Sequence, residues 1–219
     1  MSSVLIQERL RIPQGVTNLE SFRRWARSED YPDIGRLSFI NGEVWVDMSP
    51  ERLFTHNRIK TVIAARLEDL STAGESGYYF ADGALLSHPG VGLSTEPDGL
   101  FISADSVQSG RVRLISNPEG LIEVEGAPDV VVEVVSPTSA QKDKVVLRDL
   151  YWRAGVSEYW LVDVRRDVLT FEILQHAPQD YEPSSQEREW QQSRIFRRAF
   201  RLTVRKDRLG NPSYTLSIR

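Results

Sequence analysis

Two acidic residues stand where the sequence predicts buried strands. Glu133 interrupts the apolar run Val130 to Val135, and Asp98 follows Pro97 at the start of the strand predicted by "DGLFISA". A buried carboxylate is costly unless it is paired, protonated or bound to a metal. Acids on neighbouring strands can converge on Mg²⁺, which binds one or two carboxylates together with waters and substrate phosphate. The spacing alone leaves open that Glu133 faces solvent or an arginine on the surface of the sheet.

The pattern around Glu133 predicts the elements that hold these acids. Its strand is followed by "SAQKDKVVLRDLYWRAG", a helical pattern that ends at Gly155, and then by the apolar strand "EYWLVDV". Strand, helix and strand in this order indicate a βαβ unit with a parallel pair. Upstream, Asn41-Gly42 joins two alternating runs and predicts a hairpin. The stretch "PERLFTHNRIKTVIAARLEDLSTAG" predicts the clearest helix, with Pro50 at its start and Gly74 just past its end.

The remaining segments predict an α/β or α+β chain with a mixed sheet. They are a short helix at 18–30, strands at 77–87, 98–104, 110–116 and 168–175, a long polar loop at 177–192 and a terminal strand pair from 196. A length of 219 residues indicates one domain. Within it we expect an N-terminal helix and hairpin region, 1–50, and a C-terminal strand extension, 193–219.

Composition excludes several kinds of chemistry. The chain has no cysteine, which rules out disulfides, thiolate catalysis and cysteine zinc sites. No apolar run is long enough to span a membrane, and "MSSVLIQERLRIPQG" turns polar too early for a signal peptide, so we expect a cytoplasmic protein. The net charge of −4 does not suggest an overall polyanion binder. It is compatible with a local basic patch that meets nucleic acid.

Four stretches together resemble a known family. They are "INGEVWVDMSPERLFTHNRIK", "PDGLFIS", "APDVVVEVVSPTS" and "KDKVVLRDLYWRAGVSEYWLVDVR", and they span roughly 36–167. They are similar to the Uma-two family of putative restriction endonucleases, within the PD-(D/E)xK nuclease superfamily. The resemblance implies an α/β fold with a mixed central sheet flanked by helices, and Mg²⁺-dependent phosphodiester hydrolysis with Mn²⁺ as a possible substitute. It implies Asp98 and Glu133 as metal ligands, nucleic acid (DNA before RNA) as partner, and a homodimer.

The lysine expected from this resemblance is displaced. Val135 occupies the place of the superfamily's motif lysine, and Leu147 occupies the helix position where the family usually carries it. Lys144 lies about one helical turn before Leu147 and is our choice for the catalytic lysine. Lys142 is the rival, and both lysines could equally be solvated residues at a helix start. The displacement supports an alternative function, a catalytically silent nuclease-like module that binds DNA or dimerises.

Other matched positions supply accessory candidates. His56 and Asn57 match the family's polar pair on the first long helix, where a histidine could contact a metal-bound water or a phosphate; a structural histidine is the alternative. Glu43 matches a recurrent acid after the hairpin turn, although such a glutamate is often only solvated. Ser38 replaces a glutamate that many members carry. Glu51 remains as a nearby acid.

Two further acids and a basic tail fit structural roles better. Asp129 also follows a proline, but its place suggests a turn or cap, and Asp163 is expected to pair with Arg165 or Arg166. The tail could meet phosphates or simply keep an edge strand soluble; its basic residues are Arg188, Arg194, Arg197, Arg198, Arg201, Arg205, Lys206 and Arg208. A third hypothesis, phosphoesterase action on a small nucleotide, would use the same acids.

Overall fold

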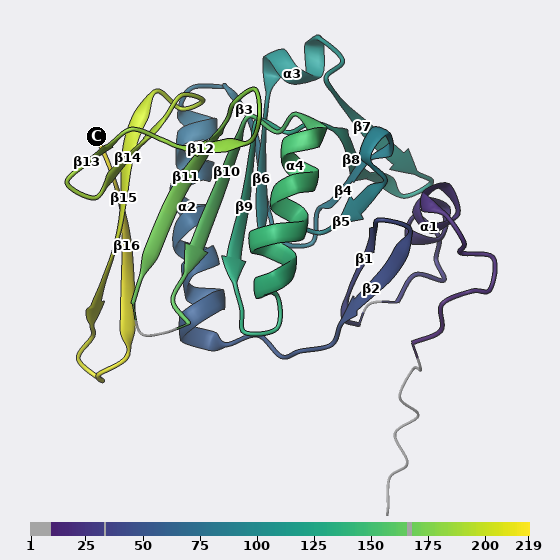
Figure 1. Ribbon diagram of the computed structural model, residues 1–219, viewed down its shortest axis with the longest axis horizontal. Helices are drawn as coiled ribbons and strands as arrows, with labels where there is room; N and C mark the ends of the chain where they lie inside the picture. The colour runs from purple at the N-terminus through teal and green to yellow at the C-terminus, as the bar shows by residue number, and fades with distance from the viewer. Residues whose placement is uncertain (1–9, 33, 166–167) are drawn as a thin grey trace, which may run out of the picture.

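The computed structural model describes residues 10–32, 34–165 and 168–219, arranged as three sheets with helices between and around them (Figure 1). The helical elements are α1 (Leu19–Ala26), α2 (Arg58–Ala73), α3 (Ala104–Gln108), α4 (Arg148–Ala154), π-helical turns at Leu53–Asn57 and Lys142–Leu147, and a 3₁₀ turn at Pro89–Val91. The strands are β1 (Arg36–Ile40), β2 (Glu43–Asp47), β3 (Gly77–Ala81), β4 (Leu85–His88), β5 (Leu93–Thr95), β6 (Gly99–Ser103), β7 (Val112–Asn117), β8 (Gly120–Gly126), β9 (Val130–Val135), β10 (Glu158–Asp163), β11 (Thr170–His176), β12 (Tyr181–Pro183), β13 (Gln186–Glu187), β14 (Trp190–Ser193), β15 (Arg198–Lys206) and β16 (Pro212–Ile218).

The central sheet brings the two acids to neighbouring strands. Its strand order is β12-β11-β10-β9-β6-β3. Strands β9 and β10 are parallel, as the βαβ pattern predicts, whereas β6 runs antiparallel to β9 with Gly99 opposite Val132. Asp98 directly precedes β6, so it lies at the same end of the sheet as the last residues of β9. The mixed sheet of the predicted α/β class is therefore confirmed.

The two faces of this sheet are covered by different layers. Alternate residues of a strand point to opposite faces; on β9, Val130, Val132 and Val134 pack in a cluster with α2 and the β13–β16 sheet. Val131 and Val135 pack instead with α4 and the β2-β1-β5-β4-β8-β7 sheet. Figure 1 shows α4 in front of the central sheet and α2 behind it. By the same alternation, Glu133 belongs to the face that α4 covers.

Both long helices begin with a π-helical turn. The helix predicted after Pro50 consists of the turn Leu53–Asn57 followed by α2, and the helix predicted before Gly155 consists of the turn Lys142–Leu147 followed by α4. In the first turn, the Asn57 N–H donates to the Arg52 carbonyl, five residues earlier, at 3.1 Å. Single π turns inside helices are rare and often occur at functional sites.

The turn prediction at Asn41-Gly42 matches the structure, but the polar region 177–192 is not the long loop that its composition suggests. Asn41 and Gly42 both have positive φ, the geometry of a tight β1–β2 turn. Region 177–192 contains β12, β13 and most of β14. Tyr181 explains part of this difference, because its buried side chain donates to the Val156 carbonyl at 2.9 Å.

The remaining predictions concern the strand at 77–87, the terminal strand pair and the domain organisation. The predicted strand at 77–87 divides into β3 and β4, which belong to different sheets, while β15 and β16 form the terminal antiparallel pair. In the parts of the chain that the structure describes, no helix is long and apolar enough to cross a membrane. The single domain with regions 1–50 and 193–219 stays a prediction, and residues 1–9 of its first region lie outside the described residues.

Candidate active site

A cleft of about 710 Å³ opens at the end of the central sheet where β9 finishes. Its walls come from the β1–β2 hairpin, the π turn before α2, the loop after β9 and the π turn before α4. The lining residues are 35–36, 47–52, 55–56, 98, 133–139, 142–143 and 164–165. Both predicted metal ligands, Asp98 and Glu133, are among them.

Asp98 is a buried, ionised carboxylate in the floor of the cleft. The Val134 N–H of the adjacent strand donates to its Oδ2 at 2.7 Å, which fixes the side chain against β9. Burial opposes ionisation, but the hydrogen bond from His56 and the positive charges of Lys60 and Arg36 outweigh it and lower the pKa of Asp98. The Arg36 guanidinium donates to Oδ1 at 3.2 Å.

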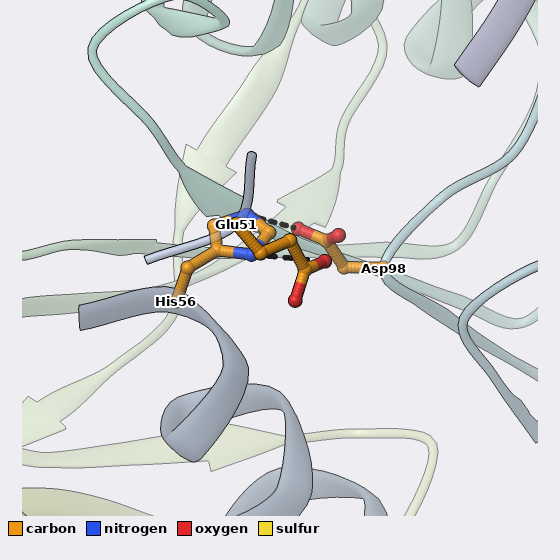
Figure 2. A group of neighbouring side chains, drawn as sticks. All are labelled: Glu51, His56 and Asp98. Carbon is orange, nitrogen blue, oxygen red and sulfur yellow. Dashed lines mark ion pairs between the residues drawn. The ribbon is translucent and has the colours of Figure 1, made fainter. Parts of the chain in front are cut away.

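His56 connects Asp98 to a second carboxylate. Its Nε2 lies 3.4 Å from Asp98 Oδ2, and its Nδ1 lies 3.4 Å from Glu51 Oε1. One ligand atom from each of these three residues lies within 4.8 Å of the others. Figure 2 shows the imidazole of His56 between the carboxylates of Glu51 and Asp98. Two carboxylates and an imidazole suit a divalent cation. The buried Nδ1 of His56 has no hydrogen-bond partner among the described residues, which is consistent with a ligand position.

Glu133 is buried and held by a tyrosine of α4. The Tyr151 hydroxyl donates to Glu133 Oε1 at 2.9 Å. Burial first, and then the negative charges of Asp143 and Asp98, raise the pKa of Glu133 well above its usual range. In the absence of a cation this side chain therefore retains a proton at pH values where an exposed glutamate is ionised. The alternative that Glu133 faces solvent does not hold, since the residue is only 4% exposed.

The cluster also contains two cations that sequence reasoning missed. Lys60, on α2, lies 2.8 Å from Asp82 and 3.7 Å from Asp98, and it also pairs with Glu51. Arg36, at the start of β1, pairs with the same three acids. His56 and Lys60 are four residues apart, so their shared helix face was a usable signal. Nothing local in the sequence links Arg36 to Asp98.

Asp143 is a third buried acid of the cleft, and it too was missed. It is 1% exposed, and burial raises its pKa to about 6. Its Oδ1 has no hydrogen-bond partner among the described residues, although Lys142 Nζ lies 3.8 Å away. The only sequence signal was its place beside Lys142 at the start of a helix.

The sequence profile of one family matches residues 19–205, which is well over half of the chain; the family is Uma2, described as "Putative restriction endonuclease". The chain belongs to the Uma2 family. The resemblance found in the sequence is thus confirmed. No curated protein sequence matches the chain.

A solved structure supports the fold of this Uma2 chain. The chain is similar to the crystal structure of a putative nuclease belonging to DUF820 from Anabaena variabilis ATCC 29413, with a TM-score of 0.60 and 17% sequence identity. The alignment covers 82% of this chain and 90% of that chain. At this identity the likeness concerns the fold, and it agrees with the mixed α/β architecture.

The two candidate lysines of the Uma2 chain lie in different surroundings. Lys144 Nζ is 2.6 Å from Asp163 Oδ2, and Arg165 binds the same carboxylate. Hydrogen bonds from Arg165 and then Lys144 lower the pKa of Asp163. Lys142, and not Lys144, is among the described residues that line the cleft. The expected Asp163–Arg165 pair is present; Arg166 lies outside the described residues.

The remaining predicted residues lie beside or away from the cleft. Asn57 Nδ2 donates to Glu51 Oε2 at 3.3 Å, so it supports an acid of the cluster. Glu43 is exposed in the hairpin and does not belong to the described lining. Asp129 pairs with Arg111 and accepts from the Ser103 N–H at 2.6 Å and the Ser106 hydroxyl at 2.7 Å, as a structural residue does.

The basic tail does not contribute to the described lining of the cleft. Arg201 of the tail contacts an aromatic ring instead: its guanidinium carbon lies 4.9 Å from the centroid of Trp190, and that of Arg219 lies 4.6 Å from the same centroid. Such cation–π contacts stabilise the packing of the sheet that contains β14–β16.

Proposed function

We propose that this chain is a metal-dependent nuclease that hydrolyses phosphodiester bonds of DNA in the cleft at the end of β9. The observation that carries the proposal is that Asp98 and Glu133, from adjacent strands, both line that cleft, with His56 and Glu51 beside Asp98. Membership of the Uma2 family supports the reaction class. The ligand types favour Mg²⁺, with Mn²⁺ as a substitute.

The chain's own residues would orient the ligands and the substrate. The Val134 N–H fixes the Asp98 carboxylate, and the Tyr151 hydroxyl fixes Glu133. Magnesium, when bound, supplies a Lewis acid for a phosphoryl oxygen and lowers the pKa of water. His56 lies between Asp98 and Glu51, so it would help to orient both carboxylates.

We assign the charge-stabilising role to Lys142 rather than to Lys144. Lys142 lines the cleft, whereas Lys144 pairs with Asp163 and is not among the described residues that line it. An ammonium group inside the cleft can stabilise the negative charge that develops on the phosphate in the transition state. Lys142 would thereby replace the lysine that is absent at Val135 and Leu147.

Cations at the rim of the cleft favour a phosphate-rich polymer as substrate. Arg52 and Arg165 line the cleft with Lys142 and come from separate segments of the chain. Contacts of this kind to phosphates provide affinity without base specificity. DNA as substrate belongs to the proposal, while a homodimer and a cytoplasmic location stay predictions.

A catalytically silent module is the second candidate. Val135 and Leu147 favour it, because both usual lysine positions carry apolar side chains, and both side chains are buried in the core. Such a module would bind DNA through the same rim without cleaving it. A small-nucleotide phosphoesterase would use the same acids, but the rim arginines have no evident role for a small substrate.

Cleavage of plasmid and linear duplex DNA, with Mg²⁺ or Mn²⁺ and with chelator, tests the proposal. We expect Asp98→Asn and Glu133→Gln to lose about 100-fold or more of the rate while remaining folded. Glu172→Gln is the matched control, because Glu172 is an exposed carboxylate on β11 of the same sheet. DNA binding by the wild type without any metal-dependent cleavage would favour the silent module. Wild-type rates in Glu133→Gln would refute the role of Glu133.

A further inference from the structure

Asp143 is held rigidly in the wall of the cleft, in the π turn before α4. The Tyr159 hydroxyl donates to its backbone carbonyl at 2.9 Å, and its own N–H donates to the Ser139 carbonyl at 2.8 Å. The Ser139 hydroxyl also donates to Asp143 Oδ2. These contacts fix both the backbone and one carboxylate oxygen, so the direction of the other oxygen is fixed as well.

That other oxygen, Oδ1, is buried without a hydrogen bond among the described residues. Lys142 Nζ, at 3.8 Å, is too distant to hydrogen bond to it. A buried acceptor left unsatisfied costs free energy, and such groups are rare in native proteins. Asp143 is nevertheless one of the residues that line the cleft, so this unsatisfied oxygen belongs to the wall of the cleft.

Glu133 is arranged in a similar way in the same cleft. A hydroxyl group holds one oxygen of each acid: Ser139 holds Asp143, and Tyr151 holds Glu133. Glu133 belongs to the face of β9 that α4 covers, and Asp143 lies in the π turn that precedes α4, so both acids line the cleft on the α4 side. Two buried carboxylates in the wall of one cleft repel when both are ionised, unless a cation lies between them.

We propose that Asp143 is a metal ligand of the cleft and shares a divalent cation with Glu133. The inference rests on the proposed function and adds a ligand beyond Asp98, Glu133 and the Glu51–His56 group. A hard divalent cation with carboxylate and water ligands fits this pair, since the ligands come from two elements that are each fixed by hydroxyl groups. Lys142 beside it then serves the substrate rather than Asp143.

Mn²⁺ titration followed by calorimetry and by the electron paramagnetic resonance signal of free Mn²⁺ tests this assignment. The titrations use the full chain, with Mn²⁺ alone and with a phosphorothioate DNA duplex that resists cleavage. Asp143→Asn should weaken Mn²⁺ binding at least about tenfold, the loss typical even when only a second-layer partner of a ligand is removed. Asp149→Asn is the matched control, because it removes an exposed carboxylate from α4, the same helix.

Thermal unfolding without metal separates loss of a ligand from loss of the fold. Asp143→Asn should melt at or above the wild-type temperature, because the substitution relieves repulsion between carboxylates. The inference would be overturned if the Mn²⁺ affinity of Asp143→Asn were within twofold of the Mn²⁺ affinity of Asp149→Asn. The proposed function would still stand in that case, provided that Asp98→Asn lost Mn²⁺ binding and cleavage. Failure of the wild type to bind Mn²⁺ with or without the duplex would overturn both. Ser139→Ala, which keeps the carboxylate, should weaken binding less than Asp143→Asn; an equal loss would indicate that folding of this turn, not ligation, is responsible.

Discussion

Glu133 and Asp143 place two acidic side chains together where water is largely excluded. Their pKa values are both raised, primarily by burial, and for Glu133 also by the charge of Asp143. Asp98 has the opposite shift, because His56, Lys60 and Arg36 stabilise its ionised form. One cleft thus contains an ionised acid and two acids that favour protonation. A cation can bind the first directly and must displace protons from the others.

This difference predicts how stability depends on pH. An acid whose pKa is higher in the folded than in the unfolded chain holds more protons when folded, so stability falls as pH rises through that interval. For Asp143 the interval runs from the ordinary aspartate range, about 4, to about 6. We expect the metal-free protein to lose on the order of 3 kcal/mol there, at about 1.4 kcal/mol per pKa unit. Urea unfolding across this pH range measures the loss. Asp143→Asn should flatten the slope, and an unchanged slope would contradict the expectation.

Some residues of the cleft could be predicted from the sequence, and others could not. Asp98 and Glu133 could be selected as candidates from the sequence because each stands at or inside a strongly apolar strand, where a carboxylate is costly unless it is paired, protonated or bound to a metal. Asp143 could not, because its burial depends on a π-helical turn that changes which side chains face the sheet. Arg36 could be linked to Asp98 only through the tertiary fold, since the two are 62 residues apart.

At the scale of elements, the central sheet and the β13–β16 sheet are joined by a buried acid at the far end from the cleft. Glu158, the first residue of β10, accepts hydrogen bonds from the Ser193 hydroxyl at 2.8 Å and from the Arg194 N–H at 2.6 Å. Trp160 Nε1 donates to the same carboxylate at 3.0 Å. Polar strands such as β13 and β14 are hard to predict for this reason: their position depends on hydrogen bonds to a distant residue rather than on apolar alternation.

Removal of this acid should loosen one element without disturbing the site. Glu158→Gln replaces one of the two acceptor oxygens by an amide NH2 group, which cannot accept, and we expect a loss of about 1–3 kcal/mol in the free energy of unfolding. Amide hydrogen exchange should accelerate in β14–β16 first. The exposed Glu182 of β12 offers a control, Glu182→Gln, with little expected effect. Loss of Mn²⁺ binding in a folded Glu158→Gln protein would show that the two ends of the sheet are more strongly coupled than this interpretation allows.

At the scale of the whole molecule, the cleft lies where layers from both faces of the central sheet meet. The π turn before α2 supplies His56 from one face, and the π turn before α4 supplies Lys142 and Asp143 from the other. The sheet supplies Asp98 and Glu133 between them. A ligand that contacts these residues therefore connects both layers, and its binding should stabilise the folded chain as a whole.

Metal binding should accordingly raise the melting temperature. A ligand at 100 times its dissociation constant stabilises the folded state by about 2.7 kcal/mol. We expect Mn²⁺ to raise the melting temperature of the wild type by several degrees, and amide exchange to slow in both π turns. Chelator should reverse the effect, and Asp98→Asn should lack it. Equal melting temperatures with Mn²⁺ and with chelator would contradict this view of the cleft.

Arg36 and Lys60 affect how the cleft behaves when no metal is bound. Each pairs with Glu51, Asp82 and Asp98, so the chain carries built-in counterions for the most acidic part of the cleft. The folded state then depends less on metal supply, because the two positive charges offset most of the negative charge of the three acids before any ion arrives. An incoming ion exchanges with side chains that are already present instead of filling an empty cage. The cleft is thereby able to persist through metal scarcity, at the cost of weaker metal affinity than bare carboxylates would give.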